Sequence, residues 1–400
     1  MKFTHNSRKR MTKKAAAGCL CLSLAFLAAA PLSAWAGPAG DIPPAVTVPD
    51  SGTGSGPAGP GGGGSVTIPD TPPAADDSFY NQAITDPIVH PVDKYSYEQM
   101  EQDILALAAR YPGRISYQTI GQTLDGRYIY DIVIGNPGAQ KKILFQGAIH
   151  GREYIVVPLM MQQIEYMLAF QDSGSYLGQP LNALMGQTAI HFIPMSNPDG
   201  VALSQLGESA IRSPELLEGI RAMYAADVAE ERTALPYEQY LVRWKSNARG
   251  VDLNHNFNAD WESLNPTLNH GSSSDFKGSA PLSEPESQAL ANVIAQNGFS
   301  AVINYHAMGQ VIYWDTNDNK KAAESYDMAT AASGVTGYQI MGSKGVGGLK
   351  DWLQRETSPI AGITLEVGRS ACPVAFSEYP AIWEQNKGIP CLFLQYILTH

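Results

Sequence analysis

The chain has 400 residues, of which 44% are hydrophobic and 16% charged, enough for a large folded core and too apolar for a disordered or collagen-like chain. Its formal net charge is −11, and residues 1–36 hold six lysines and arginines but no acid, so the rest has 21 cations against 38 acids, or −17. A body this acidic is a poor partner for nucleic acid or an anionic membrane, and we expect neither.

The first 36 residues have the three parts of an export signal. A basic stretch ends at Lys14, an apolar stretch covers 15–32, and residues 34–36 are suited to cleavage before Gly37. The alternative is an uncleaved membrane anchor, because about 18 apolar residues can just span a bilayer. We expect a secreted or cell-envelope protein with no stable membrane span after signal cleavage.

Residues 37–77 are rich in Gly, Pro, Ser, Thr and Ala and include four consecutive glycines at 61–64. Such a stretch cannot bury enough apolar surface to offset its ordering entropy, which predicts a flexible linker. The folded domain is expected at 78–400, with residues 78–92 as a short arm packed against it.

From Tyr95 onward the apolar periodicity alternates between helix and strand. The pattern predicts a helix at 97–110, strands at 115–120, 128–134 and 142–146, a helix at 156–171, a strand at 189–195, helices at 214–231 and 284–297, strands at 301–305 and 311–314, helices at 320–333 and 349–356, a strand at 360–366 and a helix at 381–396. Ser283 followed by Glu286 has the spacing of a capping box for the helix at 284–297. Apolar strands separated by helices predict one α/β domain, with a mixed, mostly buried central sheet flanked by helices on both faces.

Polar residues stand where three of the apolar strands stop. His150 follows one strand, with Glu153 three positions on; His306 ends a second strand and Glu366 a third. Ligands of open α/β sheets bind at this edge, and two imidazoles with one carboxylate form a zinc set that leaves a fourth position open. Taken alone the signal is weak, because such a pair arises by chance and a lone histidine is more often simply hydrogen-bonded.

The residues around these positions strengthen the prediction of a zinc site. The stretch 145–153, Phe-Gln-Gly-Ala-Ile-His-Gly-Arg-Glu, resembles the zinc-binding segment of the zinc metallocarboxypeptidases (the carboxypeptidase A/B type). Further motifs follow in the order of that family: Asn197-Pro198-Asp199-Gly200, Gly250-Val251-Asp252-Leu253-Asn254, Tyr305-His306, Gly348-Leu349-Lys350-Asp351-Trp352 and Thr364-Leu365-Glu366-Val367-Gly368. The resemblance covers roughly residues 93–398.

The resemblance implies a role for each matching position. His150, Glu153 and His306 would hold one Zn²⁺ ion, and Glu366 would be the general base that moves a proton from the zinc-activated water to the leaving amine. A separate carboxylate is needed because the cation occupies the ligand Glu153. The alternative for Glu366 is a strand-end acid paired with Arg369. The domain at 78–400 is thus expected to be a zinc peptidase.

Two matched positions depart from the family. The exopeptidases hold the terminal carboxylate of their substrate with an Asn-Arg pair; Asn254 is kept here, but His255 stands where the arginine is expected. A neutral imidazole lacks the permanent charge and the two parallel N–H donors with which the arginine guanidinium binds a carboxylate. Lys245 stands at the transition-state arginine of the family and is the predicted catalytic cation, with Arg243 and Arg249 as nearby substitutes.

These departures are similar to those in the bacterial branch that cleaves peptidoglycan stem peptides between γ-D-glutamate and a diamino acid such as meso-diaminopimelate. Residues 244–254 match the Trp-Lys-x-Asn-x-x-Gly-Val-Asp-Leu-Asn of that branch. Such a substrate carries extra carboxylates, which another cation could bind. Lys350, in the segment that lines the side-chain pocket of the family, is the candidate, and the alternative is a solvated lysine at a helix start.

Three functions therefore stay open. The favoured one is an exported, monomeric zinc peptidase that acts on peptidoglycan stem peptides at the γ-D-glutamyl–diamino acid bond, with a peptide or muropeptide as its substrate. The first alternative is a general zinc carboxypeptidase whose anchor is His255, Arg243 or Arg249. The second is an inactive homologue that serves as a binding module, against which the complete ligand set and Glu366 argue.

Four cysteines are present, and Cys19 and Cys21 would leave with the signal. The remaining pair, Cys372 and Cys391, is consistent with a disulfide in an exported protein or with two free buried thiols. Neither has another cysteine or a histidine at ligand spacing, so we expect no metal at either.

Overall fold

The structure is a computed structural model that describes residues 79–265, 267–342 and 346–400. Its strands position the predicted site residues. The predicted signal and linker lie outside the described residues. The strand bounds are β1 (Ile115–Gln122), β2 (Tyr128–Gly135), β3 (Lys141–Gly147), β4 (Ser175–Tyr176), β5 (Gln179–Pro180), β6 (Thr188–Ile193), β7 (Ala301–Ala307), β8 (Val311–Tyr313), β9 (Gln339–Met341) and β10 (Ala361–Val367). Eight of them form one sheet in the order β1-β2-β6-β3-β7-β10-β8-β9, and β4 pairs with β5.

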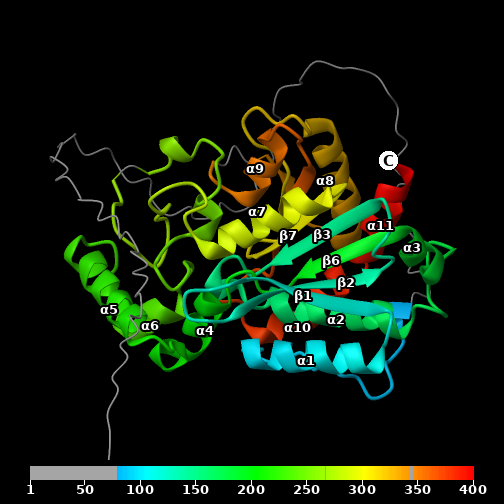
Figure 1. Cartoon of the computed structure of the whole chain (residues 1–400), viewed down its shortest axis with the longest axis horizontal. Coiled ribbons are helices and arrows are strands. Elements are labelled where there is room, and N and C mark those ends of the chain that lie inside the picture. Colours follow the sequence, from blue (N-terminus) through cyan, green and yellow to red (C-terminus); the bar gives the residue numbers. More distant parts are fainter. Residues whose placement is uncertain (1–78, 266, 343–345) are drawn as a thin grey trace, which may run out of the picture. The chain divides into compact units, whose positions relative to one another are not determined.

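The middle of the sheet is parallel and its flanks are mixed. The strands β6, β3, β7 and β10 run parallel, whereas β2 adds to β6, β1 to β2 and β8 to β10 in antiparallel pairs. The predicted mixed sheet is therefore confirmed. Because parallel strands end at one edge, the residues that follow or end β3, β7 and β10 gather there (Figure 1).

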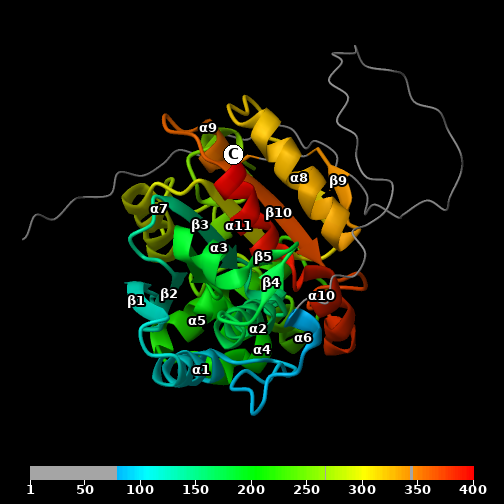
Figure 2. The ribbon, with the colours of Figure 1, turned by 90° about the vertical axis from the view of Figure 1, so that its right-hand side faces the viewer.

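Helices pack on both faces of the sheet. Their bounds are α1 (Tyr97–Arg110), α2 (Val156–Ala169), α3 (Leu181–Gln187), α4 (Pro198–Leu206), α5 (Pro214–Ala229), α6 (Tyr237–Val242), α7 (Pro285–Asn297), α8 (Ala322–Thr336), α9 (Leu349–Arg355), α10 (Tyr379–Asn386) and α11 (Ile389–Thr399). In Figure 2, α7 and α8 lie on opposite sides of β3 and β10. The helix α11 packs against α8 and β3. Among the described residues, no helix combines the length and apolarity needed to cross a bilayer.

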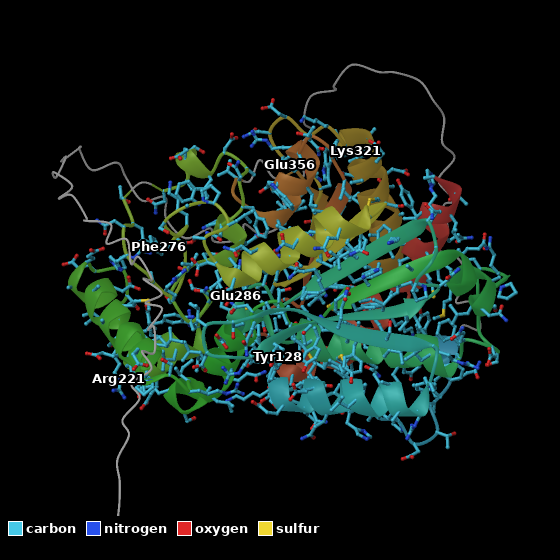
Figure 3. The ribbon with its side chains drawn as sticks, viewed as in Figure 1. Tyr128, Arg221, Phe276, Glu286, Lys321 and Glu356 are labelled. Atoms are coloured by element: carbon cyan, nitrogen blue, oxygen red, sulfur yellow. The ribbon has the colours of Figure 1, made fainter. Side chains whose placement is uncertain are left out.

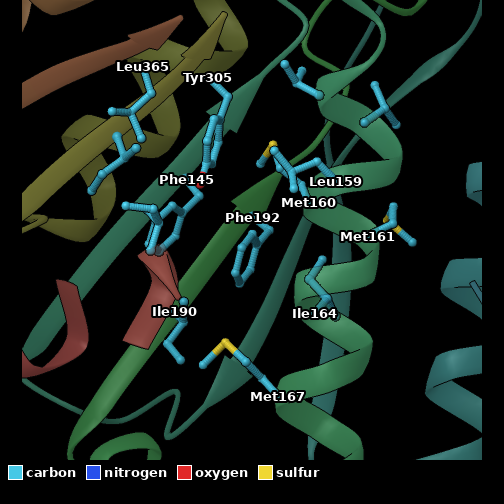
Figure 4. Packing of buried hydrophobic residues seen from close by; sticks show 14 of the residues in the cluster. Phe145, Leu159, Met160, Met161, Ile164, Met167, Ile190, Phe192, Tyr305 and Leu365 are labelled. Atoms are coloured by element: carbon cyan, nitrogen blue, oxygen red, sulfur yellow. The ribbon is translucent and has the colours of Figure 1, made fainter. Parts of the chain in front are cut away.

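Side chains of the parallel strands alternate between two cores. Phe145 of β3 and Ile303 of β7 point into the larger core, which includes residues of α2, α8 and α11; Figure 4 shows the α2 side chains packed beside Phe145. Val302 points into the smaller core with α7 and α9. His306 stands four positions after Val302, so it projects from the same face. The β7–β10 register pairs His306 with Glu366, which places both side chains on that face.

The segment 381–396, predicted as one helix, forms two. The helix α10 ends at Asn386, and Pro390 stands in the first turn of α11, where its missing N–H breaks no helical hydrogen bond. Residues 384–388 are polar or glycine, and Gly388 followed by Pro390 is a helix-stop signal that the prediction of one helix did not use.

The capping box predicted for α7 is wrong. The N-cap is Glu284, and Pro285 takes the first helical position. Ser283 instead donates its hydroxyl to Glu284 Oε1 (2.6 Å) and accepts from Asn256 Nδ2 (3.0 Å). The sequence analysis also did not predict α3, α4 and α6, which have 7, 9 and 6 residues.

Residues 79–95 pack against the domain as an arm. The Tyr80 hydroxyl is buried 3.0 Å from Cys391 Sγ of α11. Glu165 of α2 accepts the backbone N–H groups of residues 88 and 89 at 2.7 and 2.8 Å. The arm therefore joins the larger core through both apolar and polar contacts.

We expect that Phe79→Ala lowers the free energy of unfolding by about 3 kcal/mol, because truncating a buried aromatic side chain leaves a cavity. Phe79 is 1% exposed, and its ring lies against that of Phe170. Urea unfolding followed by tryptophan fluorescence measures the change. The control is Val92→Ala in the same arm, where the side chain is 47% exposed and the expected change is below about 0.5 kcal/mol. Similar small effects for both variants would exclude the arm from the cooperative core.

Candidate active site

Two histidines and one glutamate converge at the carboxyl edge of β3 and β7. His150 Nδ1 lies 2.8 Å from Glu153 Oε1, and His306 Nδ1 lies 3.0 Å from Glu153 Oε2. The two Nδ1 atoms are 3.2 Å apart, and the three side chains are buried. The structure thus brings together the three residues that the sequence predicted as metal ligands.

This cluster suits a divalent metal ion better than a set of hydrogen bonds. A neutral imidazole has a single N–H, and His150 Nε2 faces the Asp252 carboxylate at 3.3 Å. With the N–H on Nε2, the Nδ1 lone pair points at Glu153, an arrangement that needs a cation between them. One ligand atom from each residue lies within 4.8 Å of the others. Two nitrogens and one oxygen with a fourth position open are the donors of a catalytic zinc site.

The loop that carries two of these ligands is held by close backbone contact. A Cβ on Gly151 would lie 2.4 Å from the Gly200 carbonyl group, so only glycine fits there. Asn197 caps α4 by accepting from Gly200 N, and its amide donates to the carbonyls of Ile149 (3.1 Å) and Ser246 (3.0 Å). The matched Asn-Pro-Asp-Gly motif therefore positions the metal loop and does not itself face the cluster.

Asp252 links the metal ligands to the predicted catalytic cation. Its carboxylate lies 3.3 Å from His150 Nε2, 3.0 Å from Lys245 Nζ and 3.6 Å from His255 Nδ1. Burial alone would raise the pKa of Asp252, but Lys245, His255 and His150 hold it well below its ordinary range. The sequence reasoning noted Asp252 only as part of a matched motif, although an acid two positions before Asn254 was the available signal.

Glu366 lies beside the cluster on β10. Burial raises the pKa of its carboxyl to about 7, with Glu153 acting in the same direction and His306, Lys245 and Arg152 opposing. Arg369 instead directs its guanidinium to Gln310, and among the described residues no ion pair joins it to Glu366. The alternative of a structural pair between Glu366 and Arg369 therefore has no support in the geometry.

A cavity of about 350 Å³ opens beside the metal ligands. It is lined by His150, Lys245, Asn254, His255, Leu264, His306, Tyr313, Val346, Gly348, Lys350, Asp351, Thr364 and Glu366. Of the predicted site residues, Glu153 and Arg249 alone are absent from this lining. Segments far apart in the sequence thus form one cleft.

Lys350 is buried at the start of α9 and is only 7% exposed. Its Nζ donates to the Asp315 carbonyl and to Asp351 Oδ1, the latter at 2.6 Å. An ammonium has three N–H donors, so one remains for a group in the cavity. The alternative of a solvated helix-start lysine is wrong.

Arg249, predicted to bind substrate, is engaged elsewhere. Its Nη2 lies 2.8 Å from Glu284 Oε1, and its Nε donates to Glu284 Oε2 at 3.2 Å. Arg243, the other substitute named for Lys245, is exposed at the end of α6 and is absent from the cavity lining. Of the three cations in this segment, Lys245 is the one that lines the cavity.

The Glu284 contact belongs to a polar network that fixes the segment 244–254. Asn247 donates to Glu284 Oε2 (2.9 Å) and Glu286 Oε2 (3.2 Å), and it accepts the backbone N–H of Val251 (3.0 Å). Glu286 lies at the N-terminal end of α7 (Figure 3). Burial, with the nearby carboxylates of Asp199 and Glu284, raises its pKa to about 8. It is therefore a neutral acid in the folded protein at pH 7.

The two cysteines of the domain are free thiols. Cys391 is buried against Tyr80 of the arm, and Cys372 donates to the Arg152 carbonyl at 3.4 Å. Neither belongs to a cluster of metal-ligating side chains among the described residues.

The sequence is similar to known zinc peptidases. The family model described as zinc carboxypeptidase matches residues 100–387. The chain is 32% identical over 314 residues to γ-D-glutamyl-L-diamino acid endopeptidase 1 of Lysinibacillus sphaericus, an alignment that covers 77% of this chain and 74% of that protein. It is 26% identical over 228 residues to human mast cell carboxypeptidase A, covering 56% of this chain and 47% of that protein.

Comparisons of the structure agree with the fold. Carboxypeptidase A from Helicoverpa armigera aligns with a TM-score of 0.56 at 18% identity, covering 76% of this chain and 73% of that one. Thrombin activatable fibrinolysis inhibitor aligns with a TM-score of 0.59 at 17% identity, covering 78% of this chain and 77% of the other.

We expect Glu286 to make the stability of the protein fall as pH rises. Its pKa rises on folding from an ordinary value near 4.5 to about 8. Below about pH 4.5 Glu286 is protonated in both the folded and the unfolded state, so it does not change the free energy of unfolding. Between the two values the unfolded chain ionises while the folded protein keeps its proton, so wild-type stability falls relative to Glu286→Gln, by a few kcal/mol in total.

Urea unfolding of both proteins at pH 5 and pH 9 measures this difference. Glu218→Gln, on an exposed position of α5, is the matched control and should follow the wild-type trend. Parallel pH profiles for wild type and Glu286→Gln would contradict the prediction.

Proposed function

Because the chain belongs to the zinc carboxypeptidase family and is a zinc metallopeptidase, we propose that it is exported and hydrolyses the γ-D-glutamyl–diamino acid bond of peptidoglycan stem peptides. The Lysinibacillus sphaericus relative bears the name of this activity. The signal-like residues 1–36 support action outside the cytoplasm, where such peptides lie.

The observation that carries the proposal is the choice of cations in the cleft. Among the described residues that line it, there is no arginine to grip a terminal carboxylate, and His255 stands at the matching position. Lys350 lies in the same cavity with one ammonium donor left over. A substrate with additional carboxylates suits a buried lysine, since a charge-assisted hydrogen bond is stronger than a neutral one.

Each step of the hydrolysis has a residue in place. Zinc, when held by His150, Glu153 and His306, supplies Lewis acidity to the scissile carbonyl and to water. Glu366 then accepts a proton from the attacking water and passes it to the leaving nitrogen. Burial suits Glu366 to accept a proton, because it raises the pKa of the carboxyl above that of an exposed glutamate.

Lys245 supplies positive charge where the carbonyl oxygen becomes negative. Burial alone would lower the pKa of Lys245, but Asp252 and Glu153 outweigh it and raise the pKa, which keeps the ammonium charged. Its Nζ lines the cavity and is held 3.0 Å from Asp252 Oδ2. A fixed charge of this kind stabilises the transition state without reorganisation.

We expect Glu366→Gln to lower kcat by roughly 10²- to 10⁴-fold, because an amide cannot accept the proton. The zinc content, measured by atomic absorption, should match that of the wild type, since Glu366 is not a ligand. Glu238→Gln, an exposed change on α6, is the control and should keep full activity. Wild-type activity in Glu366→Gln would rule out Glu366 as the base.

Purified muropeptides separate the proposed activity from that of a general carboxypeptidase. The zinc-loaded protein should cut after γ-D-glutamate, and it should still do so when the C-terminus of the peptide is amidated. Mass spectrometry of the products gives the cleavage site. Removal of the metal with a chelator should abolish cleavage, and added zinc should restore it.

Two results would contradict the proposal. Efficient release of C-terminal residues from plain peptides, lost on amidation and without γ-D-glutamyl cleavage, would indicate the general carboxypeptidase. A zinc-loaded protein with neither activity would indicate the inactive homologue.

A further inference from the structure

Segment 272–276 holds both members of the ion pair between Lys245 and Asp252. The carbonyl of Ser273 accepts the backbone N–H of Lys245 at 2.8 Å. The backbone N–H of Asp275 donates at 3.2 Å to Asp252 Oδ2, the oxygen that lies 3.0 Å from Lys245 Nζ. One short segment therefore sets where the predicted catalytic ammonium lies.

The backbone of Lys245 is held from its other side by the metal loop. Its carbonyl accepts the backbone N–H of Gly151 at 2.9 Å, and Gly151 lies between the metal ligands His150 and Glu153. Lys245 is thus fixed between segment 272–276 and the loop that carries two metal ligands. A shift of the segment would move the ammonium relative to those ligands.

Two residues between the Asn-Pro-Asp-Gly and Trp-Lys motifs anchor segment 272–276. The Tyr240 hydroxyl of α6 accepts the backbone N–H of Ser273 at 3.0 Å and donates to Asp227 Oδ2 of α5 at 2.6 Å. The Ser272 hydroxyl donates to the same carboxylate oxygen at 2.6 Å. The helices α5 and α6 are therefore tied to the segment by a continuous chain of hydrogen bonds.

This chain of hydrogen bonds is buried beside an apolar cluster. Tyr240 packs in the cluster that includes Ile220, Leu241 and Trp244, and it is 2% exposed. Asp227 is 1% exposed. A buried carboxylate and a buried hydroxyl disfavour folding unless they are hydrogen-bonded, and a low dielectric strengthens the bonds that they make. Apolar side chains would serve packing alone, so the polar pair adds a fixed orientation of the segment to which it bonds.

We propose that Asp227 and Tyr240 are positioning residues that act through segment 272–276 to hold Lys245 at the carbonyl oxygen of the scissile bond. The inference rests on the role of Lys245 in the proposed function. Neither positioning residue is among the described residues that line the cavity. A displaced ammonium stabilises the developing negative charge less, because this stabilisation depends on charges placed in advance. The loss therefore falls on kcat and leaves KM nearly unchanged.

The first variant removes one hydroxyl. Tyr240→Phe keeps the ring, which packs edge-on against Trp244, but takes a hydrogen-bond partner from both Ser273 N and Asp227. On the purified muropeptide, kcat should fall roughly tenfold while KM changes by less than about twofold. Rates are expressed per zinc-loaded protein, with zinc measured by atomic absorption, so a lower yield of folded enzyme does not enter them.

A double-mutant cycle with Lys245→Met shows whether the effect passes through the ammonium. Lys245→Met alone should lower kcat by roughly 10²- to 10³-fold, because a charge at the reacting oxygen is lost. In the Lys245→Met protein, adding Tyr240→Phe should change kcat by less than about twofold. A general loosening of the site would instead lower kcat by the same factor with and without Lys245.

Tyr224→Phe is the matched control. Its ring lies in the same aromatic cluster, with centroids 5.1 Å from that of Tyr240, but its hydroxyl donates to the Leu235 carbonyl. This variant should keep the wild-type kcat and KM. Ser272→Ala is a second test variant, because it removes the other hydroxyl from Asp227. It should lower kcat in the same direction and lose its effect in the Lys245→Met protein.

The outcomes separate this inference from the proposed function. Wild-type kcat in both Tyr240→Phe and Ser272→Ala, equal losses with and without Lys245, or wild-type kcat in Lys245→Met would each overturn the positioning role, while γ-D-glutamyl cleavage stands. If the wild type releases only C-terminal residues, the proposed bond is wrong, and the same cycle on a plain peptide decides the positioning role. A zinc-loaded protein that cleaves neither substrate would overturn both.

Discussion

The parallel register of β3, β7 and β10 is the constraint on which the site depends. It sets Glu366 beside His306 and Gly147 beside Tyr305, so the chain leaves β3 next to both and delivers His150 three residues later. Ladder hydrogen bonds in the interior of the sheet hold these positions. A slip of one residue would turn each strand side chain to the opposite face and point His306 into the larger apolar core. The chemistry is therefore tied to the most rigid part of the fold.

Around this frame the protein uses two different solutions for buried acids. Asp252 stays ionised because Lys245 and two imidazoles surround it, and removing one partner would leave an uncompensated charge. Glu286, beside other carboxylates and without a lysine or arginine in hydrogen-bond contact, keeps its proton instead. The first solution fixes the charge near the reacting atoms. The second holds the segment 244–254 in place without adding a further negative charge.

The sequence was sufficient for the elements with long periodic patterns and for residues at strand ends. It predicted α1 with its observed bounds. It also placed His150, His306 and Glu366 at one sheet edge, because each stands where an apolar strand stops. The break between α10 and α11 was missed although Gly388 and Pro390 mark it, because the prediction joined the apolar residues on either side into one helix.

The partners of individual side chains were harder to predict from the sequence. Arg249 and Lys350 carry the same charge in the sequence, yet one pairs with Glu284 outside the cleft and the other is buried within it. That difference depends on which residues meet in three dimensions, and local patterns do not encode it.

The contact between Tyr80 and Cys391 joins positions 311 residues apart. An arm made early must therefore wait for the final helix before it can dock. Closure of the larger core is therefore postponed until α11 has been synthesised. Contact between such distant segments slows folding, because the entropy of closing the long loop is lost before the stabilising contact forms.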